Sequence, residues 1–136
     1  MRRPHAVLTA ALAALALAGC GATTEPSADR FQGAEREVAD KVEELQEAGE
    51  RRRPEDICAD ILARALVQQL EAAGTTCNDE MEKAIEDADD FQLEVRDVTV
   101  TGNTATARVR RGDEGPVRTF EFARENGQWR ATSLSG

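Results

Sequence analysis

The chain contains very few of the side chains that most enzymes use for acid–base or nucleophilic catalysis. It has one histidine, His5, and no tyrosine, and its three serines lie near the chain ends at positions 27, 133 and 135. A catalytic serine triad needs a histidine base, and the body of the chain supplies none. The composition therefore argues against the commonest hydrolytic sites.

Carboxylates are the remaining candidates, because burial can raise the pKa of a carboxyl group until it acts as a base. Asp60, however, is expected about 200° around a helix from Cys58, on the side opposite the apolar stripe. Glu121 alternates with Phe120 and Phe122 on a predicted strand. Both carboxylates are expected in solvent, so we expect no enzymatic activity, no catalytic residue and no cofactor.

Basic residues are also scarce. The chain holds 17 Lys and Arg against 26 Asp and Glu, a net charge of −9, and such a chain repels phosphate backbones, which excludes nucleic acid as a partner. Residues 31–90 hold 7 basic and 18 acidic side chains, whereas residues 91–136 hold 7 and 6. The acidic part has helical patterning, and the near-neutral part has strand patterning.

The N-terminus has the form of an export signal. Arg2 and Arg3 precede an apolar run over residues 6–18, interrupted only by Thr9. A bilayer core needs about 20 apolar residues in a helix, so this run is too short to span a membrane but suits a signal peptide. We expect residues 1–19, His5 included, to be removed.

The run ends in Leu17, Ala18, Gly19 and Cys20, which resembles a bacterial lipobox. That resemblance implies cleavage before Cys20 and attachment of acyl chains such as palmitate to it. Two or more chains anchor a protein stably, so we expect a lipid-anchored protein on the extracytoplasmic face of the cell membrane. An ordinary secretory signal followed by an incidental cysteine is the alternative.

The remaining chain is interpreted as a short tether and one domain. Residues 20–30 are expected to form the lipidated cysteine and a flexible tether, followed by a single α+β domain over residues 31–136 with its core at about 54–134. Apolar residues at helical spacing predict helices near residues 31–53, 55–73 and 78–88, the last with Asn78 as its N-cap. Two to three helices should therefore pack on a curved sheet.

Alternation of apolar and polar residues after position 90 predicts four antiparallel strands. The alternation slips between Val95 and Val98, which indicates a β-bulge. Gly102–Asn103 and Asn126–Gly127 are typical of two-residue hairpin turns. The arginines of these strands, at positions 108, 110, 118 and 130, are expected to share an exposed face. They are expected to pair with acids such as Glu94 and Glu121 at little net energy, and docking of an acidic partner on this face is the alternative.

Cys58 and Cys77 are expected to form a disulfide, because an exported domain folds under oxidising conditions. Without histidine, a metal site would need carboxylates to complete it, and we expect none. A straight helix from Cys58 to residue 73 would be roughly 22 Å long, and four residues return at most ~14 Å. A bridge therefore requires the helix to kink or split, and we place the break near residues 63–65.

The order of these features resembles the small actinobacterial lipoproteins that carry a nuclear-transport-factor-like, or cystatin-like, cone domain. The motifs that carry the resemblance are the lipobox, Ile57–Ala59, Gly74–Cys77, Val98–Ala105 and Asn126–Arg130. The resemblance covers roughly residues 54–134. It implies a curved sheet wrapped on helices, often with a pocket between them, and this fold hosts several functions.

We therefore expect a non-catalytic interaction or scaffold role in the cell envelope, with an envelope protein as a possible partner. An alternative is that the domain binds a small apolar ligand. A pocket for it would be lined by four aromatic residues, which otherwise simply fill the core: Phe91, Phe120, Phe122 and Trp129.

Overall fold

The computed structural model describes residues 27–134. Helical elements come first: η1 (Ser27–Arg30), α1 (Gly33–Glu50), α2 (Pro54–Asp56), η2 (Ile57–Ile61), α3 (Arg64–Ala72) and α4 (Cys77–Glu86). Four strands follow: β1 (Leu93–Thr101), β2 (Thr104–Arg111), β3 (Val117–Glu125) and β4 (Gln128–Ser133). The predicted α+β class, with helices before a curved antiparallel sheet, is confirmed. The predicted signal peptide and Cys20 lie outside the described residues.

The sheet is a simple meander in the order β1-β2-β3-β4. Gly102 has φ +60 at the first position of the β1–β2 turn, as a type II′ turn requires. Asn126 and Gly127 have φ of 53 and 79, so the β3–β4 turn has the positive φ values of a type I′ turn. Both predicted hairpins are present because these residues tolerate the left-handed region.

The predicted bulge in β1 is also present. The register of β1 against β2 shifts between Val95 and Asp97. As a result Val95 and Val98, three residues apart, are both buried on the face that packs against the helices. Without the extra residue, the period of two would place one of them in solvent.

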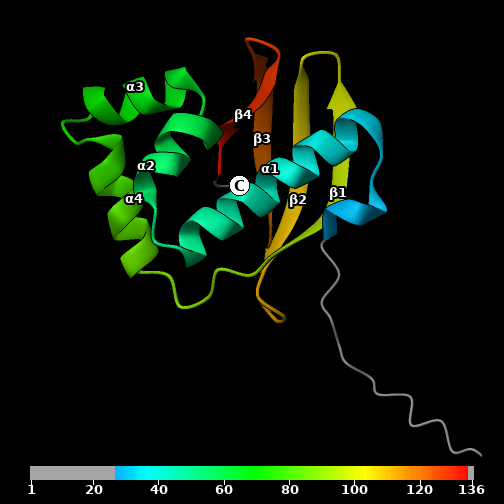
Figure 1. Cartoon of the computed structure of the whole chain (residues 1–136), viewed down its shortest axis with the longest axis horizontal. Helices are drawn as coiled ribbons and strands as arrows, with labels where there is room; N and C mark the ends of the chain where they lie inside the picture. The colour runs from blue at the N-terminus through cyan, green and yellow to red at the C-terminus, as the bar shows by residue number, and fades with distance from the viewer. Residues whose placement is uncertain (1–26, 135–136) are drawn as a thin grey trace, which may run out of the picture.

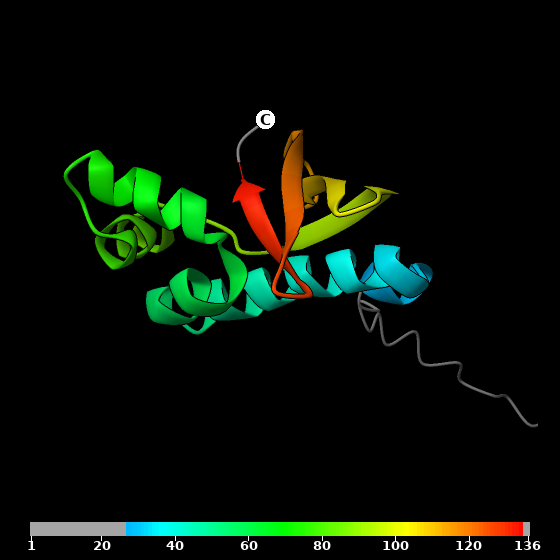
Figure 2. The same cartoon turned by 90° about the horizontal axis from the view of Figure 1, so that it is seen from above.

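Helix α1 covers one face of the sheet, and the shorter helices lie beside it at the β4 side (Figures 1 and 2). The inward side chains Val38, Ala39 and Val42 of α1 are fully buried against the sheet. The predicted range of core residues, 54–134, is therefore too short, because α1 also contributes an apolar stripe to the core. The opposite face of the sheet is not covered by any helix of the described residues (Figure 2).

The second predicted helix is split, as the disulfide argument requires. Leu62 and Ala63 are extended, and the Ala63 N–H donates to the Ala131 carbonyl at 2.8 Å. This contact covers the outer edge of β4. A disulfide joins Cys58 in η2 to Cys77 at the start of α4, with their Cα atoms 6.0 Å apart. The N-cap of α4 is Thr76, whose hydroxyl accepts from the Asp79 N–H at 3.1 Å, so the prediction of Asn78 is wrong by two residues.

Removing the disulfide should destabilise the domain. Cys58 and Cys77 are 19 residues apart in sequence. Closing a loop of this length lowers the conformational entropy of the unfolded chain, which stabilises the fold by about 3 kcal/mol. We expect Cys58→Ser with Cys77→Ser to lower the free energy of unfolding, measured by urea denaturation, by about that amount. A reductant should lower the stability of the parent protein and leave the double variant unchanged. Equal stability of the two proteins would contradict the prediction.

Replacement of Gly49 should reveal its close contact with Phe91. A Cβ at position 49 would lie 2.6 Å from Phe91 Cδ1, although alanine is intrinsically better than glycine in a helix by about 1 kcal/mol. Because overpacking costs about 1–3 kcal/mol, we expect Gly49→Ala to lower the unfolding free energy. In a Phe91→Ala background the same change should be neutral or stabilising. A loss of equal size in both backgrounds would argue against the contact.

Candidate functional site

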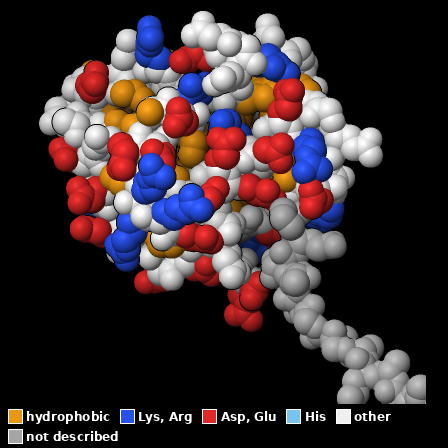
Figure 3. Space-filling view, viewed as in Figure 1, with side chains coloured by type: hydrophobic (Ala, Val, Ile, Leu, Met, Phe, Trp, Pro, Cys, Tyr) orange, Lys and Arg blue, Asp and Glu red, His pale blue; other side chains and the backbone are white. Residues whose placement is uncertain are grey.

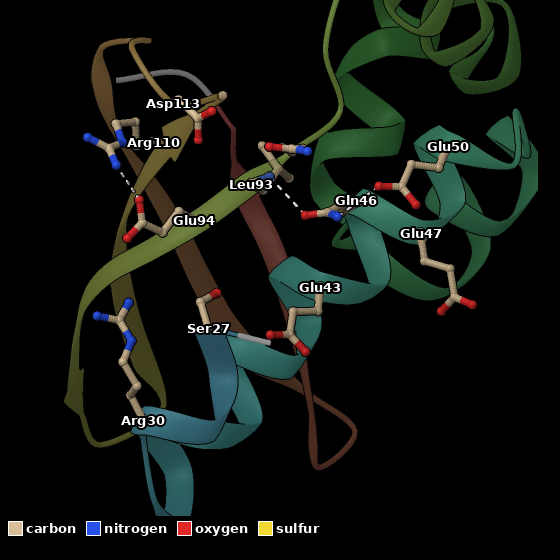
Figure 4. Close-up of a pocket in the computed structure, with 12 residues that line it drawn as sticks. Ser27, Arg30, Glu43, Gln46, Glu47, Glu50, Leu93, Glu94, Arg110 and Asp113 are labelled. Carbon is tan, nitrogen blue, oxygen red and sulfur yellow. Dashed lines mark hydrogen bonds and ion pairs between the residues drawn. The ribbon is translucent and has the colours of Figure 1, made fainter. Parts of the chain in front are cut away.

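A groove with a volume of about 580 Å³ lies between α1 and the β1–β2 end of the sheet (Figure 4). We call it the polar groove. Its walls come from η1, α1, the segment that leads into β1, β1 itself, the end of β2 and the β2–β3 turn. It is lined by Ser27, Arg30, Glu43, Gln46, Glu47, Glu50, Gln92, Leu93, Glu94, Arg110, Gly112 and Asp113.

One end of the polar groove is closed by η1, which is bonded to the outer edge of β1. The Ser27 hydroxyl accepts from the Val95 N–H at 3.2 Å, and the Arg30 guanidinium donates to the Val95 carbonyl. The Ala28 N–H donates to Glu43 at 2.8 Å, and the Ala28 side chain is fully buried. The prediction of a flexible tether through residue 30 is therefore wrong for residues 27–30, because these contacts make Ser27 the start of the folded part.

The α1 wall of the groove is acidic. Glu43, Glu47 and Glu50 occupy positions i, i+4 and i+7 of the helix, which share one face, and Figure 4 shows them on the same wall. Gln46 fixes this wall to the sheet: its Oε1 accepts from the Leu93 N–H, and its amide nitrogen donates to Glu50, both at 2.8 Å. The Gln46 side chain thus holds the α1 wall against the backbone of β1.

The strand wall carries an arginine–glutamate pair. Glu94 and Arg110 are directly opposite in the β1–β2 register, and their side chains meet at 2.6 Å, with Arg96 3.0 Å from the other Glu94 oxygen. Desolvation alone would raise the pKa of Glu94, but the hydrogen bond and charge of Arg110, followed by those of Arg96, outweigh it and lower the pKa. Glu94 is therefore held as a carboxylate.

The strand arginines do not all share one face, so this prediction is wrong. Arg108 and Arg110 are the neighbours of Val109 along β2, so they point to the face opposite Val109. Arg118 is paired with Val109 across β2 and β3, so it points to the same face as Val109. The expected pairing with Glu94 is present for Arg110. Over the α1 side of the molecule, acidic and basic side chains are interspersed with small apolar areas (Figure 3).

A second cavity, of about 120 Å³, adjoins the polar groove. We call it the apolar cavity. It lies between the end of α1, α4 and the start of β1, and it shares Gln46 and Leu93 with the polar groove. It is lined by Leu45, Gln46, Gly49, Ile57, Met81, Ala84, Ile85, Ala88, Asp90, Phe91, Leu93, Arg111, Phe120 and Leu134.

Two of the four aromatic residues considered for a pocket line this cavity. They are Phe91 and Phe120. Phe122 and Trp129 lie in the core with 2% and 3% exposure, because they pack between the sheet and α1. The Trp129 indole donates to Glu37 on α1 at 3.0 Å. The alternative of one pocket lined by all four aromatics therefore does not apply to the described residues, and Phe122 and Trp129 fill the core.

The other predicted site residues are distributed as follows. Leu17, Ala18, Gly19 and Cys20 lie outside the described residues. Within residues 27–134, no group of three or more His, Cys, Asp or Glu side chains is arranged to hold a metal ion. No helix in the same range is long and apolar enough to cross a membrane.

The polar groove is not predicted from the sequence. Ser27 falls in the predicted tether, and no role is predicted for Gln46. The spacing of Glu43, Glu47 and Glu50 does indicate a common face. The η1 end of the groove could not be found, since residues 27–30 are too few to show periodicity.

Substitution of Glu94 should remove part of the dependence of stability on pH at acidic values. A lowered folded-state pKa stabilises the fold above the ordinary value of 4.5, and this stabilisation is lost as the pH falls through the folded-state pKa. We expect Glu94→Gln to lower the unfolding free energy at pH 7 by less than about 1 kcal/mol, and the difference from the parent to vanish at low pH. Glu82→Gln on α4 is the control. A difference that persists below the folded-state pKa would contradict this.

No protein family, curated protein or solved structure matches this chain. The resemblance to cone-domain lipoproteins therefore stays a prediction.

Proposed function

We propose that this protein is an exported lipoprotein, anchored through lipid on Cys20, whose domain binds a ligand or partner without catalysis at the polar groove. The observation that carries the proposal is the groove itself. The Gln46 side chain on α1 and the Ser27 hydroxyl on η1 accept hydrogen bonds from the Leu93 and Val95 N–H groups at the edge of β1, and these bonds fix the walls of the groove. A site whose walls are already fixed loses little conformational freedom on binding.

The position of Ser27 supports a role close to the membrane. Only six residues separate Cys20 from Ser27, and an extended chain spans at most ~3.5 Å per residue, so their Cα atoms are within about 25 Å. A lipid on Cys20 would therefore hold the η1 end of the polar groove near the bilayer surface. The bridged pair Cys58–Cys77 suits the oxidising conditions outside the cytoplasm.

The chemistry of the groove supports binding more than catalysis. Its serine hydroxyl accepts a backbone hydrogen bond, and Glu43 and Glu50 accept hydrogen bonds from Ala28 and Gln46. Glu94 is held ionised by Arg110 and Arg96. These groups have the positions and charge states of fixed recognition elements, not of a nucleophile with a base beside it.

Binding of a purely apolar ligand is less well supported. Pockets for small molecules usually measure about 300–1,000 Å³, whereas the apolar cavity measures about 120 Å³. It would hold only part of such a ligand. The remainder would have to lie in the adjoining polar groove.

Lipid attachment can be tested by growing a bacterial host that expresses the full chain with an alkyne analogue of palmitate. We expect label on the protein, recovery in the membrane fraction, and an intact mass that starts at Cys20 with added acyl groups. Cys20→Ser should abolish the label and release the protein from the membrane, whereas Cys58→Ser with Cys77→Ser should retain the label. An unlabelled parent protein would refute the anchor.

A further inference from the structure

Two cavities of opposite chemistry meet at one boundary in this domain. The polar groove and the apolar cavity share Gln46 and Leu93, and the hydrogen bond between these residues forms the boundary. Both ends of the Gln46 amide are bonded, to the Leu93 N–H and to Glu50. The oxygen and the nitrogen of the Gln46 amide therefore already have hydrogen-bond partners within the protein.

The charge of the polar groove selects the head of a ligand. Seven charged side chains line it, five of them carboxylates (Glu43, Glu47, Glu50, Glu94 and Asp113) and two arginines (Arg30 and Arg110). Arg110 is paired with Glu94, Glu47 is paired with Arg51 at 2.7 Å, and Arg30 donates to the backbone of β1. The excess charge is thus negative, and it comes from Glu43 and Glu50 on the α1 wall and from Asp113 in the β2–β3 turn. Figure 4 shows the α1 wall facing the strand wall across the groove. This wall is complementary to a cation.

The apolar cavity limits the size of the tail. Its volume of about 120 Å³ corresponds to roughly four groups of water size, at about 30 Å³ each. Most of its lining is aliphatic or aromatic, including Leu45, Met81, Phe91 and Phe120, and the charged residues Asp90 and Arg111 also line it. One short alkyl chain fits this space, and each methylene buried there should tighten binding by about fourfold.

We propose that the polar groove and the apolar cavity together bind a single-chain amphiphile with an ammonium head and a short alkyl tail. The head lies against the α1 wall beside Glu43 and Glu50. The tail passes Gln46 and Leu93 into the apolar cavity. This inference rests on the proposed function only in taking the groove as a binding site.

The first test compares three probes on the chain from residue 20 onward, with Cys20→Ser so that no lipid is attached. Titration calorimetry should show that hexylammonium binds at least tenfold more tightly than methylammonium, which has the same head without the tail. Hexyl sulfate, with a similar tail and a negative head, should not bind. Equal binding of hexylammonium and hexyl sulfate, or no binding of hexylammonium, would overturn the proposal.

Variants then separate the two parts of the site. Ala84 is exposed and lines the apolar cavity, so Ala84→Phe should weaken hexylammonium at least tenfold and leave methylammonium unchanged. Ala72→Phe, on an exposed position of α3 outside both cavities, is the matched control. Glu43→Gln with Glu50→Gln should weaken both cations, and Glu82→Gln neither. Circular dichroism identifies any variant that has not folded. The comparison of the three probes does not depend on these variants, so it tests the proposal even if a variant fails to fold.

The two proposals fail in different ways. Lipid on Cys20 without any binding of hexylammonium would overturn this inference and leave the anchor intact. Selective binding of hexylammonium without lipid on Cys20 would overturn the anchor and support the site.

Discussion

The backbone groups on the two outer strands of the sheet need hydrogen-bond partners, and the rest of the structure is arranged around this need. An unpaired strand edge costs free energy when buried and invites aggregation when exposed. At β4 the Ala131 carbonyl is satisfied by Ala63, which requires the second helix to break. At β1 the N–H groups of Leu93 and Val95 are satisfied by side chains of Gln46 and Ser27. The polar groove is the space left between these contacts.

Much of the fold could be predicted because its determinants are local. The Asn126–Gly127 turn follows from residues that tolerate positive φ, and the bulge in β1 follows from the slip in parity between Val95 and Val98. The split of the second helix followed from chain geometry, since a straight helix could not return from Cys58 to Cys77. Each of these inferences needed only a short stretch of sequence and one physical rule.

The groove could not be predicted because its contacts join distant segments through polar side chains. Ser27 meets Val95 across 68 positions, and Gln46 meets Leu93 across 47. A glutamine on a helix otherwise rich in acids has no periodicity that distinguishes it from a solvated neighbour. The same reason left open whether the four aromatics line a pocket or fill the core: alternation shows that Phe122 and Trp129 point inward, but not that α1 fills the space above them.

The disulfide also changes what a break in the chain would mean. Cys58 and Cys77 enclose the whole of α3, which has no fully buried side chain, together with the exposed turn at Gly74. Such turns are the sites that proteases cut most readily. After a single cut there, the N-terminal fragment, with α1, would remain covalently joined to the fragment with α4 and the sheet. In an environment rich in proteases, a nicked molecule therefore keeps its sheet and both walls of the polar groove in one covalent unit.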